Sequence, residues 1–541
     1  MFESSRHRLL VALVAAAVIP YFLNLGVSSI WDANEAFYAQ TPREMMEAGD
    51  YVTPSFNFQL RMNKPVLSYW NVAASYHLFG ISEWSERLPI AIGGVVIIAT
   101  AFALGRLCGG TLAGLFAALV LATSPRIFLL ARRIIIDIHI TMWTGLVLLF
   151  FALAETRPQR RRVYLCLMYA AAGFGVLTKG PVAVFLPAVV FFIYLASQKR
   201  LADLRHMMLP TGALISLAIV VPWYYFLYRE HGWEYIGAFI FGENLGRYAE
   251  AVGEQSRGLL FYFPVMLADL FPWSLLIPLS LWAAIRYGWH DRAARLMVIW
   301  IAVIVVFFSL SGTKEDLYIL PIVTAEAALI GAMLAKAIEG SPVTKPVGWF
   351  TAATAVLFAL TGALALWTFA IAHRYSLEGG ALIGAIAAVG SAGSVVWLVR
   401  RNVFASAATI AASLVAIVWC VAVCALPDFE RYKPVKPFSD IIRSRASVGA
   451  IVGSYKFALP SMVFYLHRPV MEVVLPDHLR AVFYSSSDVY FIMAEHEYNS
   501  IKARLPVETY VLARQQMFDL RPKNFLDGSE LPQFVLVSNR D

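Results

Sequence analysis

The segment WDANEAFYAQTPREMMEAGDYVTPSFNFQLRMNKPVLSYW, residues 31–70, brings acids, bases, aromatic residues and prolines together in a chain that is otherwise strongly apolar. It follows the first long apolar run, which ends near residue 28. Ionisable groups are costly in the hydrocarbon core of a bilayer, so a dense set of them marks a segment outside that core. The sequence therefore predicts that the chemistry of this protein is concentrated in its first extramembrane loop.

The composition is that of a polytopic membrane protein. Of the 541 residues, 59% are hydrophobic and only 15% are charged, whereas soluble proteins carry about 25% charged residues. Apolar runs of about 20 residues, the length that crosses a bilayer as a helix, recur along the chain. We predict an α-helical membrane protein with about thirteen spans. The predicted spans are 8–28, 86–106, 111–130, 138–155, 163–178, 181–197, 207–227, 259–284, 296–312, 317–336, 348–371, 380–399 and 404–425.

The distribution of basic residues predicts the orientation in the membrane. The net charge is +8, but no stretch resembles a basic arm that binds nucleic acid, so nucleic-acid partners are excluded. Lysine and arginine gather in alternate loops, and the positive-inside rule assigns those loops to the cytoplasm. We therefore predict a cytoplasmic N-terminus on a retained signal-anchor helix. The loop over 29–85 and the C-terminal segment are then on the outer side.

The residues after about 425 differ in pattern from the spans. The sequence SVGAIVGSYKFALPSMVFYLHRPVMEVV reads as strand, helix and strand, DVYFIMAEHEYNSIKARL as strand and helix, and FVLVSN as a strand. This alternation predicts a small α/β domain over 426–541, after a transmembrane domain over 1–425, with KPVKPF as the linker. The four cysteines lie in or beside predicted spans, and we interpret them as buried apolar side chains rather than a disulfide framework.

Local signals predict interfacial helices within the first loop. Thr41, Pro42 and Glu44 have the spacing of a capped helix N-terminus, and Gly49 is a suitable stop. The run NKPVLSYWNVAASYHLFG predicts a further helix that lies in the plane of the membrane interface. Both helices would hold charged side chains close to the lipid headgroups.

Three charged residues of the loop stand among aromatic side chains. A charge in such surroundings is desolvated unless it has a partner or a ligand, so each of the three is a candidate site residue. The other charged residues of the loop are equally well explained by ion pairs on a solvated helix surface. The three candidates are Asp32, Glu35 and Lys64.

The loop resembles the first periplasmic loop of the bacterial C-superfamily (GT-C) glycosyltransferases. These include the lipid A 4-amino-4-deoxy-L-arabinose transferases and relatives of the protein O-mannosyltransferases. Their pattern is W-x-P-D-E-x-R-Y-A-E-x-x-R-E-M, then G-D-W-x-x-P, then E-K-P-x-x-Y-W, against WDANEAFYAQTPREM, GDYVTP and NKPVLSYW here. Later segments agree in order: ARRIIIDIHITMW, LTKGP, FIFGENLGRY, LLFYFPVMLADLFPWS and SGTKEDLYILP. The resemblance covers roughly residues 1–330 and implies the GT-C fold.

The resemblance also implies an activity. Such an enzyme takes a sugar from a polyprenyl-phosphate donor, undecaprenyl phosphate in bacteria, and passes it with inversion to a lipid A, glycan or protein acceptor. The location implied is the bacterial inner membrane, with the reaction and the C-terminal domain on the periplasmic side. No cofactor is implied with certainty, and a divalent metal is left open.

The implied chemistry selects the candidate residues. A leaving lipid phosphate needs cations to meet its developing charge, and a hydroxyl acceptor needs a carboxylate base within hydrogen-bond reach. The resemblance implies as catalytic candidates Asp32, Glu35 and Asp137. It implies as residues that bind the donor lipid phosphate Lys64, Arg132, Arg247, Lys314 and Tyr318.

The chain departs from the family pattern at three positions. Asn34 stands where the pattern has Asp, Phe37 where it has Arg, and Asn63 where it has Glu. Without those carboxylates, a metal site assembled from these positions is disfavoured. An acceptor that is already an anion, such as a lipid A phosphate, needs no base, whereas a hydroxyl acceptor needs Asp32 or Asp137. Both acceptor classes remain open.

Two rival functions also remain open. A GT-C relative that binds polyprenyl-phosphate lipids without transferring a sugar would be consistent with Asn34. A transporter would place ionisable residues at mid-span and show internal repeats. Asp269, within a predicted span, is the residue that best fits a transporter, but the sequence contains no internal repeat that we can detect.

Overall fold

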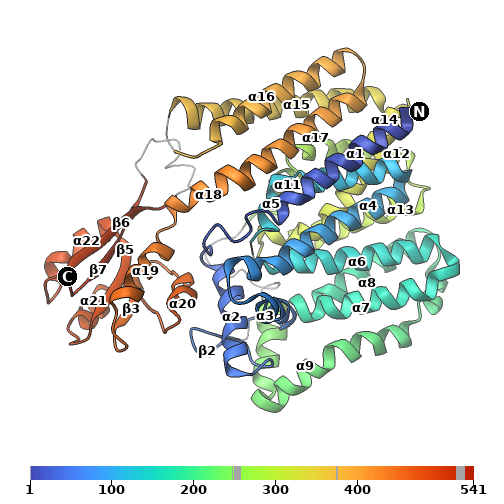
Figure 1. Cartoon of the computed structure of the whole chain (residues 1–541). Helices are drawn as coiled ribbons and strands as arrows, with labels where there is room; N and C mark the ends of the chain where they lie inside the picture. Colours follow the sequence, from blue (N-terminus) through green and yellow to red (C-terminus); the bar gives the residue numbers. More distant parts are fainter. Residues whose placement is uncertain are drawn as a thin grey trace.

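The computed structural model shows a bundle of long helices with a smaller domain of strands and short helices at one end (Figure 1). The structure describes residues 2–61, 63–133, 135–246, 248, 257–372, 376–518 and 531–541. Helices form the bundle because an apolar run in a bilayer must satisfy its backbone hydrogen bonds within itself. The bundle helices are α1 (Phe2–Val18), α4 (Glu83–Ala122), α6 (Ile136–Thr156), α7 (Arg161–Lys179), α8 (Val182–Ser197), α9 (Leu209–Gly237), α11 (Tyr262–Asp269), α12 (Ile277–Tyr287), α13 (Arg292–Ser309), α14 (Val323–Ile338), α15 (Thr344–Leu366), α16 (Gly380–Val399) and α17 (Val403–Cys420).

Each predicted span contains a helix of the bundle. Among the described residues, eight helices are long and apolar enough to cross a membrane, and a bent pair would make a ninth. The bend is 118° and lies between Leu259–Asp269 and Trp273–Tyr287. Helix α4 joins two predicted spans across a break at Gly109 and Gly110, where Gly110 has a φ of 78° that favours glycine. The predicted α-helical membrane architecture is confirmed.

The first helix of the first loop begins well before the start predicted at Thr41. The loop folds into α2 (Asn34–Ala48), a hairpin of β1 (Ser55–Phe56) and β2 (Gln59–Leu60), and α3 (Leu67–Phe79). The fold therefore builds a compact cap on the bundle from the segment that carries the densest chemistry.

The helix start predicted at Thr41 is wrong. Helix α2 continues through Thr41 and Pro42, and both residues are buried. Packing of this face against α3 outweighs the local start signal, as tertiary contacts often do. The stop predicted at Gly49 is confirmed, because Gly49 has a φ of 67° and its N–H donates to the carbonyls of Met45 and Met46.

The predicted C-terminal α/β domain is confirmed. Its sheet has the strand order β4-β3-β5-β7-β6, with β3 parallel to both its neighbours and β7 antiparallel to both of its own. The sequence analysis did not predict β6 or α21. The elements are β3 (Ile451–Tyr455), α20 (Ser461–Leu466), β4 (Met471–Val473), α21 (Pro476–Phe483), β5 (Val489–Ala494), α22 (Glu495–Ile501), β6 (Tyr510–Gln516) and β7 (Gln533–Ser538).

The segment KPVKPF is not a linker. Helix α19 (Val435–Arg445) begins inside it, with Pro434 at the N-cap position. A proline at a helix start removes no helical hydrogen bond, so this proline marks the beginning of an element rather than a break between elements. The chain thus passes from the bundle to the sheet domain through a helix.

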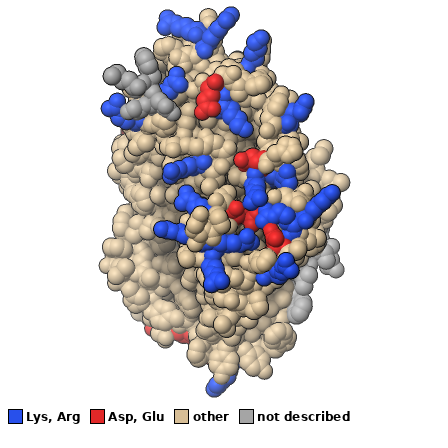
Figure 2. Space-filling model, turned by 90° about the vertical axis from the view of Figure 1, so that its right-hand side faces the viewer, with Lys and Arg blue, Asp and Glu red and all other residues tan. Residues whose placement is uncertain are grey.

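One end of the bundle is rich in basic side chains. Figure 2 views the end remote from the C-terminal domain and shows far more Lys and Arg than Asp and Glu. Such an excess of Lys and Arg is what the positive-inside rule describes for loops on the cytoplasmic side. The first loop and the C-terminal domain lie together at the opposite end (Figure 1).

Candidate active site

A cavity of about 740 Å³ opens where the first loop faces the ends of several bundle helices. Its walls come from α2, the segment before α3, the start of α6, the end of α7, the start of α8 and the segment between α13 and α14. The walls combine apolar side chains with a few polar ones, as ligand sites generally do. The lining includes the polar and aromatic side chains of Asn34, Tyr38, Lys64, Asp137, Lys179, Glu315, Asp316 and Tyr318.

The centre of the polar wall is an ion pair between Asp137 and Lys179. Asp137 lies in the first turn of α6 and Lys179 is the last residue of α7. Lys179 Nζ contacts Asp137 Oδ1, and the two side chains are 17% and 12% exposed. Each charge lies at the helix end whose dipole favours it. The ammonium is also 5.1 Å from the ring centroid of Tyr318. Asp137 and Tyr318 therefore occupy the cavity that their predicted roles require.

Lys64 and α2 form the facing wall. Lys64 lines the cavity, as its predicted role in phosphate binding requires. Asn34 and Tyr38 are one helical turn apart and so share the face of α2 that borders the cavity. The ring of Tyr38 stacks on Tyr69 of α3 with 5.4 Å between centroids. The position at which the family pattern has an acid is thus a cavity position, and here it carries a neutral amide.

Glu35 is not in the cavity, although the sequence predicted it as a catalytic acid. Its carboxylate accepts hydrogen bonds from Arg87 Nε at 2.8 Å and from the backbone N–H of Trp31 at 2.7 Å. Burial alone would raise the pKa of Glu35, but the charge and hydrogen bonds of Arg87, together with the charges of Lys433 and Arg133, lower it below its usual value. Arg87 is 1% exposed and also donates to the carbonyls of Leu25, Ser28 and Ser29. The Glu35 carboxylate therefore links Arg87 of α4 to the backbone of the first loop.

Asp32 faces the C-terminal domain instead of the cavity. Its two oxygens accept hydrogen bonds from the backbone N–H and the hydroxyl of Ser461, both at 2.7 Å. Two further contacts tie the loop to that domain: Asn57 exchanges two 2.9 Å hydrogen bonds with the backbone of Val470, and Arg43 donates to the carbonyl of Phe464. The geometry assigns Asp32 to the junction of loop and domain.

We expect this junction to respond to pH. Burial raises the pKa of Asp32 to about 6, against hydrogen bonds from Ser461 that lower it, whereas an unfolded Asp titrates near about 3.9. The folded protein therefore binds this proton more tightly, and the resulting stability is lost as the pH rises through about 6. Lowering the pH from 7 to 5 should stabilise the wild type relative to Asp32→Asn in thermal unfolding. Parallel pH profiles of the two proteins would contradict this expectation.

Two of the predicted phosphate-binding residues are engaged elsewhere. Arg132 donates to the carbonyls of Pro20, Leu23 and Asn24 and is 5% exposed. Lys314 is buried and donates to the carbonyl of Ser311 at 2.7 Å, which closes its own loop. Both cations satisfy backbone carbonyls rather than line the cavity.

Arg247, the remaining predicted phosphate ligand, lies outside the described residues.

The sequence analysis missed Lys179 and a chain of charges behind the cavity. Lys179 belongs to the LTKGP segment, whose single lysine at the end of an apolar run was the available signal. Arg126 lies between two acids, with Nη2 2.6 Å from Asp316 and Nε 3.0 Å from Asp269. Asp269 is fully buried, so the residue that best suited a transporter is already neutralised by an arginine. No motif signalled this pairing, because its members are far apart in the sequence.

The part of the chain that the structure describes contains no group of three His, Cys, Asp or Glu side chains placed to hold a metal ion.

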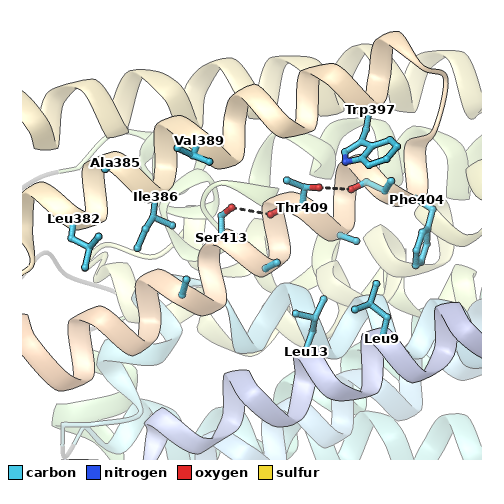
Figure 3. A pocket seen from close by; sticks show the side chains of 14 residues that line it. Leu9, Leu13, Leu382, Ala385, Ile386, Val389, Trp397, Phe404, Thr409 and Ser413 are labelled. Carbon is cyan, nitrogen blue, oxygen red and sulfur yellow. Dashed lines mark hydrogen bonds between the residues drawn. The ribbon is translucent and has the colours of Figure 1, made fainter.

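A second hollow lies on the side of the bundle between α1, α16 and α17 and has a volume of about 700 Å³ (Figure 3). Its lining is almost wholly apolar. The hydroxyls of Thr409 and Ser413 are satisfied within α17, by the carbonyls of Ala405 and Thr409. A groove lined in this way offers an apolar chain a place to lie but little chemistry.

The fold matches that of a solved membrane-protein structure over almost its whole length. The crystal structure of ArnT from Cupriavidus metallidurans bound to undecaprenyl phosphate superposes with a TM-score of 0.79. The match covers 98% of this chain and 97% of that one at 24% identity, and the apo structure of the same protein gives 0.78. The chain has the ArnT fold. The GT-C resemblance read from the sequence is confirmed.

Sequence comparison agrees with the ArnT fold. Residues 63–226 match the family Dolichyl-phosphate-mannose-protein mannosyltransferase. The chain is 30% identical over 341 residues to the undecaprenyl phosphate-alpha-4-amino-4-deoxy-L-arabinose arabinosyl transferase of Pseudomonas aeruginosa strain UCBPP-PA14, over 61% of this chain and 60% of that one. An uncharacterized protein of Aquifex aeolicus is 29% identical over 60% of this chain and 64% of its own. The chain thus spans less than two thirds of the length of these relatives.

Proposed function

We propose that the protein is an inverting glycosyltransferase that takes a sugar from a polyprenyl-phosphate carrier, with undecaprenyl phosphate as the carrier. The observation that carries the proposal is the cavity that joins Lys64, Asp137, Lys179 and Tyr318 within a fold matching that of ArnT. ArnT was solved with undecaprenyl phosphate bound. The acceptor is a lipid A, glycan or protein group that reaches the same cavity.

The cavity residues divide the reaction between them. The bond between the sugar carbon and the carrier phosphate breaks, and the acceptor oxygen forms the new bond from the opposite face of the sugar. The carrier phosphate leaves with added negative charge, which Lys64 and Lys179 stabilise. Asp137 accepts the proton of a hydroxyl acceptor. An acceptor that is already an anion brings no proton, and Asp137 then serves to orient Lys179.

The proposal includes an orientation in the bacterial inner membrane. The end of the bundle rich in Lys and Arg (Figure 2) faces the cytoplasm, in keeping with the positive-inside rule. The N-terminus is then cytoplasmic, and the first loop, the cavity and the C-terminal domain are periplasmic. A lipid-linked donor in the periplasmic leaflet reaches the cavity from the headgroup region.

A second candidate function is favoured by one observation. Asn34 lines the cavity at the position where the GT-C pattern has an acid. A relative that binds polyprenyl-phosphate lipids without transferring a sugar would tolerate this amide, because binding an anion requires the cations and not the acid.

The deciding experiment measures release of polyprenyl phosphate by the purified protein in lipid with a panel of undecaprenyl-phosphate sugars. We expect release by the wild type and a loss of about 100- to 1,000-fold in Lys64→Ala, because one preorganised charge is removed from the leaving group. Arg229→Gln, a change at an exposed arginine, is the control. Carrier binding without release from any donor would favour the binding protein instead.

A further inference from the structure

A single arginine beside the cavity is held entirely by aromatic rings. The Cζ atom of Arg61 lies 3.6 Å from the centroid of Phe37 and 5.8 Å from that of Phe56. These two rings meet edge to face at 4.8 Å. The backbone of Arg61 is anchored by a 2.9 Å hydrogen bond from its N–H to the carbonyl of Pro54. The guanidinium is therefore fixed in place on the face of a ring.

This guanidinium has no polar partner in the ranges that the structure describes. No hydrogen bond or ion pair engages it there, and its Nε atom is buried. A guanidinium carries five N–H donors, and a buried donor left without an acceptor costs free energy. Stacking on an aromatic ring satisfies the face of the group but leaves its N–H edge open for a planar or tetrahedral anion. The arrangement is that of a cation prepared for a ligand.

Arg61 does not itself line the cavity but lies next to residues that do. Lys64, three residues later, lines the cavity, and Phe37 precedes Tyr38, which lines it too. The positive charge also reaches Tyr69, the ring on which Tyr38 stacks: burial raises the pKa of Tyr69 to about 12, and Arg61 opposes that rise. Two neighbouring elements, α2 and the segment before α3, thus place the guanidinium close to residues of the cavity lining.

The sequence adds an independent observation. The GT-C pattern has an arginine where this chain has Phe37, and the structure lays Arg61 directly on the ring of Phe37. Arg61 therefore supplies a positive charge next to position 37, where the GT-C pattern supplies one from its own arginine.

We propose that Arg61 replaces the arginine lost at position 37 and binds a phosphate group of a substrate in the cavity. Guanidinium and phosphate pair through two parallel hydrogen bonds, a geometry that a preoriented arginine favours. The phosphate belongs either to the polyprenyl carrier or to a phosphorylated acceptor. The choice between these two molecules rests on the proposed function, whereas the binding of a phosphate group by Arg61 does not.

The first test measures binding of undecaprenyl phosphate and of diphosphorylated lipid A to the protein in lipid nanodiscs. Arg61→Gln should weaken binding of one or both about 10- to 100-fold, the range for one charged hydrogen-bonded contact. Arg61→Lys should recover part of the loss, because a lysine keeps the charge but not the paired geometry. A loss confined to undecaprenyl phosphate assigns the donor phosphate, and a loss confined to lipid A assigns the acceptor phosphate.

Two controls separate binding from structure. Undecaprenol and dephosphorylated lipid A lack the phosphate, so their binding should be the same in Arg61→Gln and wild type. Arg229→Gln removes an exposed arginine and should leave all four ligands unaffected. Unchanged binding of both phosphorylated ligands in Arg61→Gln would overturn the proposal, as would an equal loss for the ligands without phosphate.

An exchange of residues tests the replacement itself. Arg61→Phe alone should bind the phosphorylated ligand as weakly as Arg61→Gln, whereas Arg61→Phe combined with Phe37→Arg should return to within about threefold of wild type. A folded double variant that fails to recover would overturn the exchange of positions. These assays need no sugar transfer, so a protein that releases no polyprenyl phosphate would refute the proposed function and still give a result for Arg61.

Discussion

Asp137→Asn is expected to lower the rate of polyprenyl phosphate release with a hydroxyl acceptor by about 100- to 10,000-fold, the range for loss of a general base. Among the described acids that line the cavity, Asp137 is paired with the cavity lysine Lys179. Glu315 and Asp316 are half exposed and are paired with Arg257 and Arg126 behind the wall. Because the partner of Asp137 also lines the cavity, we propose Asp137 as the acid that acts on the acceptor.

Three variants separate the base from the ion pair. Glu315→Gln removes another carboxylate of the same cavity and should stay within about threefold of wild type, the scatter we allow for a rim charge. Lys179→Met should weaken binding of undecaprenyl phosphate, whereas Asp137→Asn should not, because the amide removes no cation. With a phosphorylated acceptor, the effect of Asp137→Asn should shrink, since no proton is transferred. Full activity of Asp137→Asn with every hydroxyl acceptor would contradict its role as base.

Arg87→Met, near the start of α4, is expected to destabilise the first loop strongly. It removes the buried cation that donates to the carboxylate of Glu35 and to three backbone carbonyls. Breaking a buried ion pair from one side costs about 3–5 kcal/mol. Thermal unfolding in detergent should therefore show a large fall in midpoint.

Two comparisons test the cause. Arg480→Met breaks an exposed ion pair, in which Arg480 and Asp477 are 45% and 88% exposed, and should cost less than about 1 kcal/mol. Adding Glu35→Gln to Arg87→Met should recover part of the lost stability, because it removes the unpaired charge. A midpoint unchanged in Arg87→Met would show that the loop does not depend on this pair.

Several parts of the molecule were predictable because their signals are local. Runs of apolar residues identified the membrane helices, and the period of the strands after residue 450 identified the C-terminal α/β domain. Thr41 shows the limit of local signals. Thr41, Pro42 and Glu44 have the spacing typical of a helix start, but α2 is buried here and continues through Thr41. The strand β6 was missed for a related reason, since its exposed residues alternate irregularly around a shift in register at Val511 and Ala513.

The candidate site residues also fall into two groups, those that motifs predicted correctly and those whose place depends on distant partners. Lys64, Asp137 and Tyr318 were predicted from motifs and line the cavity, because each motif places a polar residue at a helix end or loop. Asp32 and Glu35 carry the same chemistry in the same loop, but Ser461 and Arg87 take their oxygens. These partners are 429 and 52 residues away along the chain, so no spacing rule could assign them.

The sequence by itself determined the class of protein, the approximate position of its membrane helices, its GT-C resemblance and the place of its densest chemistry. Hydropathy and motif spacing carry that information, because they depend on residues close together in the chain. Only the tertiary structure decided which ionisable groups face the cavity, which lock the loop to the bundle and the C-terminal domain, and that Arg61 lies on Phe37. Those outcomes depend on which residues, distant in the sequence, pair with each charge in the folded protein. Burying a charge without a partner in a low-dielectric interior costs too much free energy.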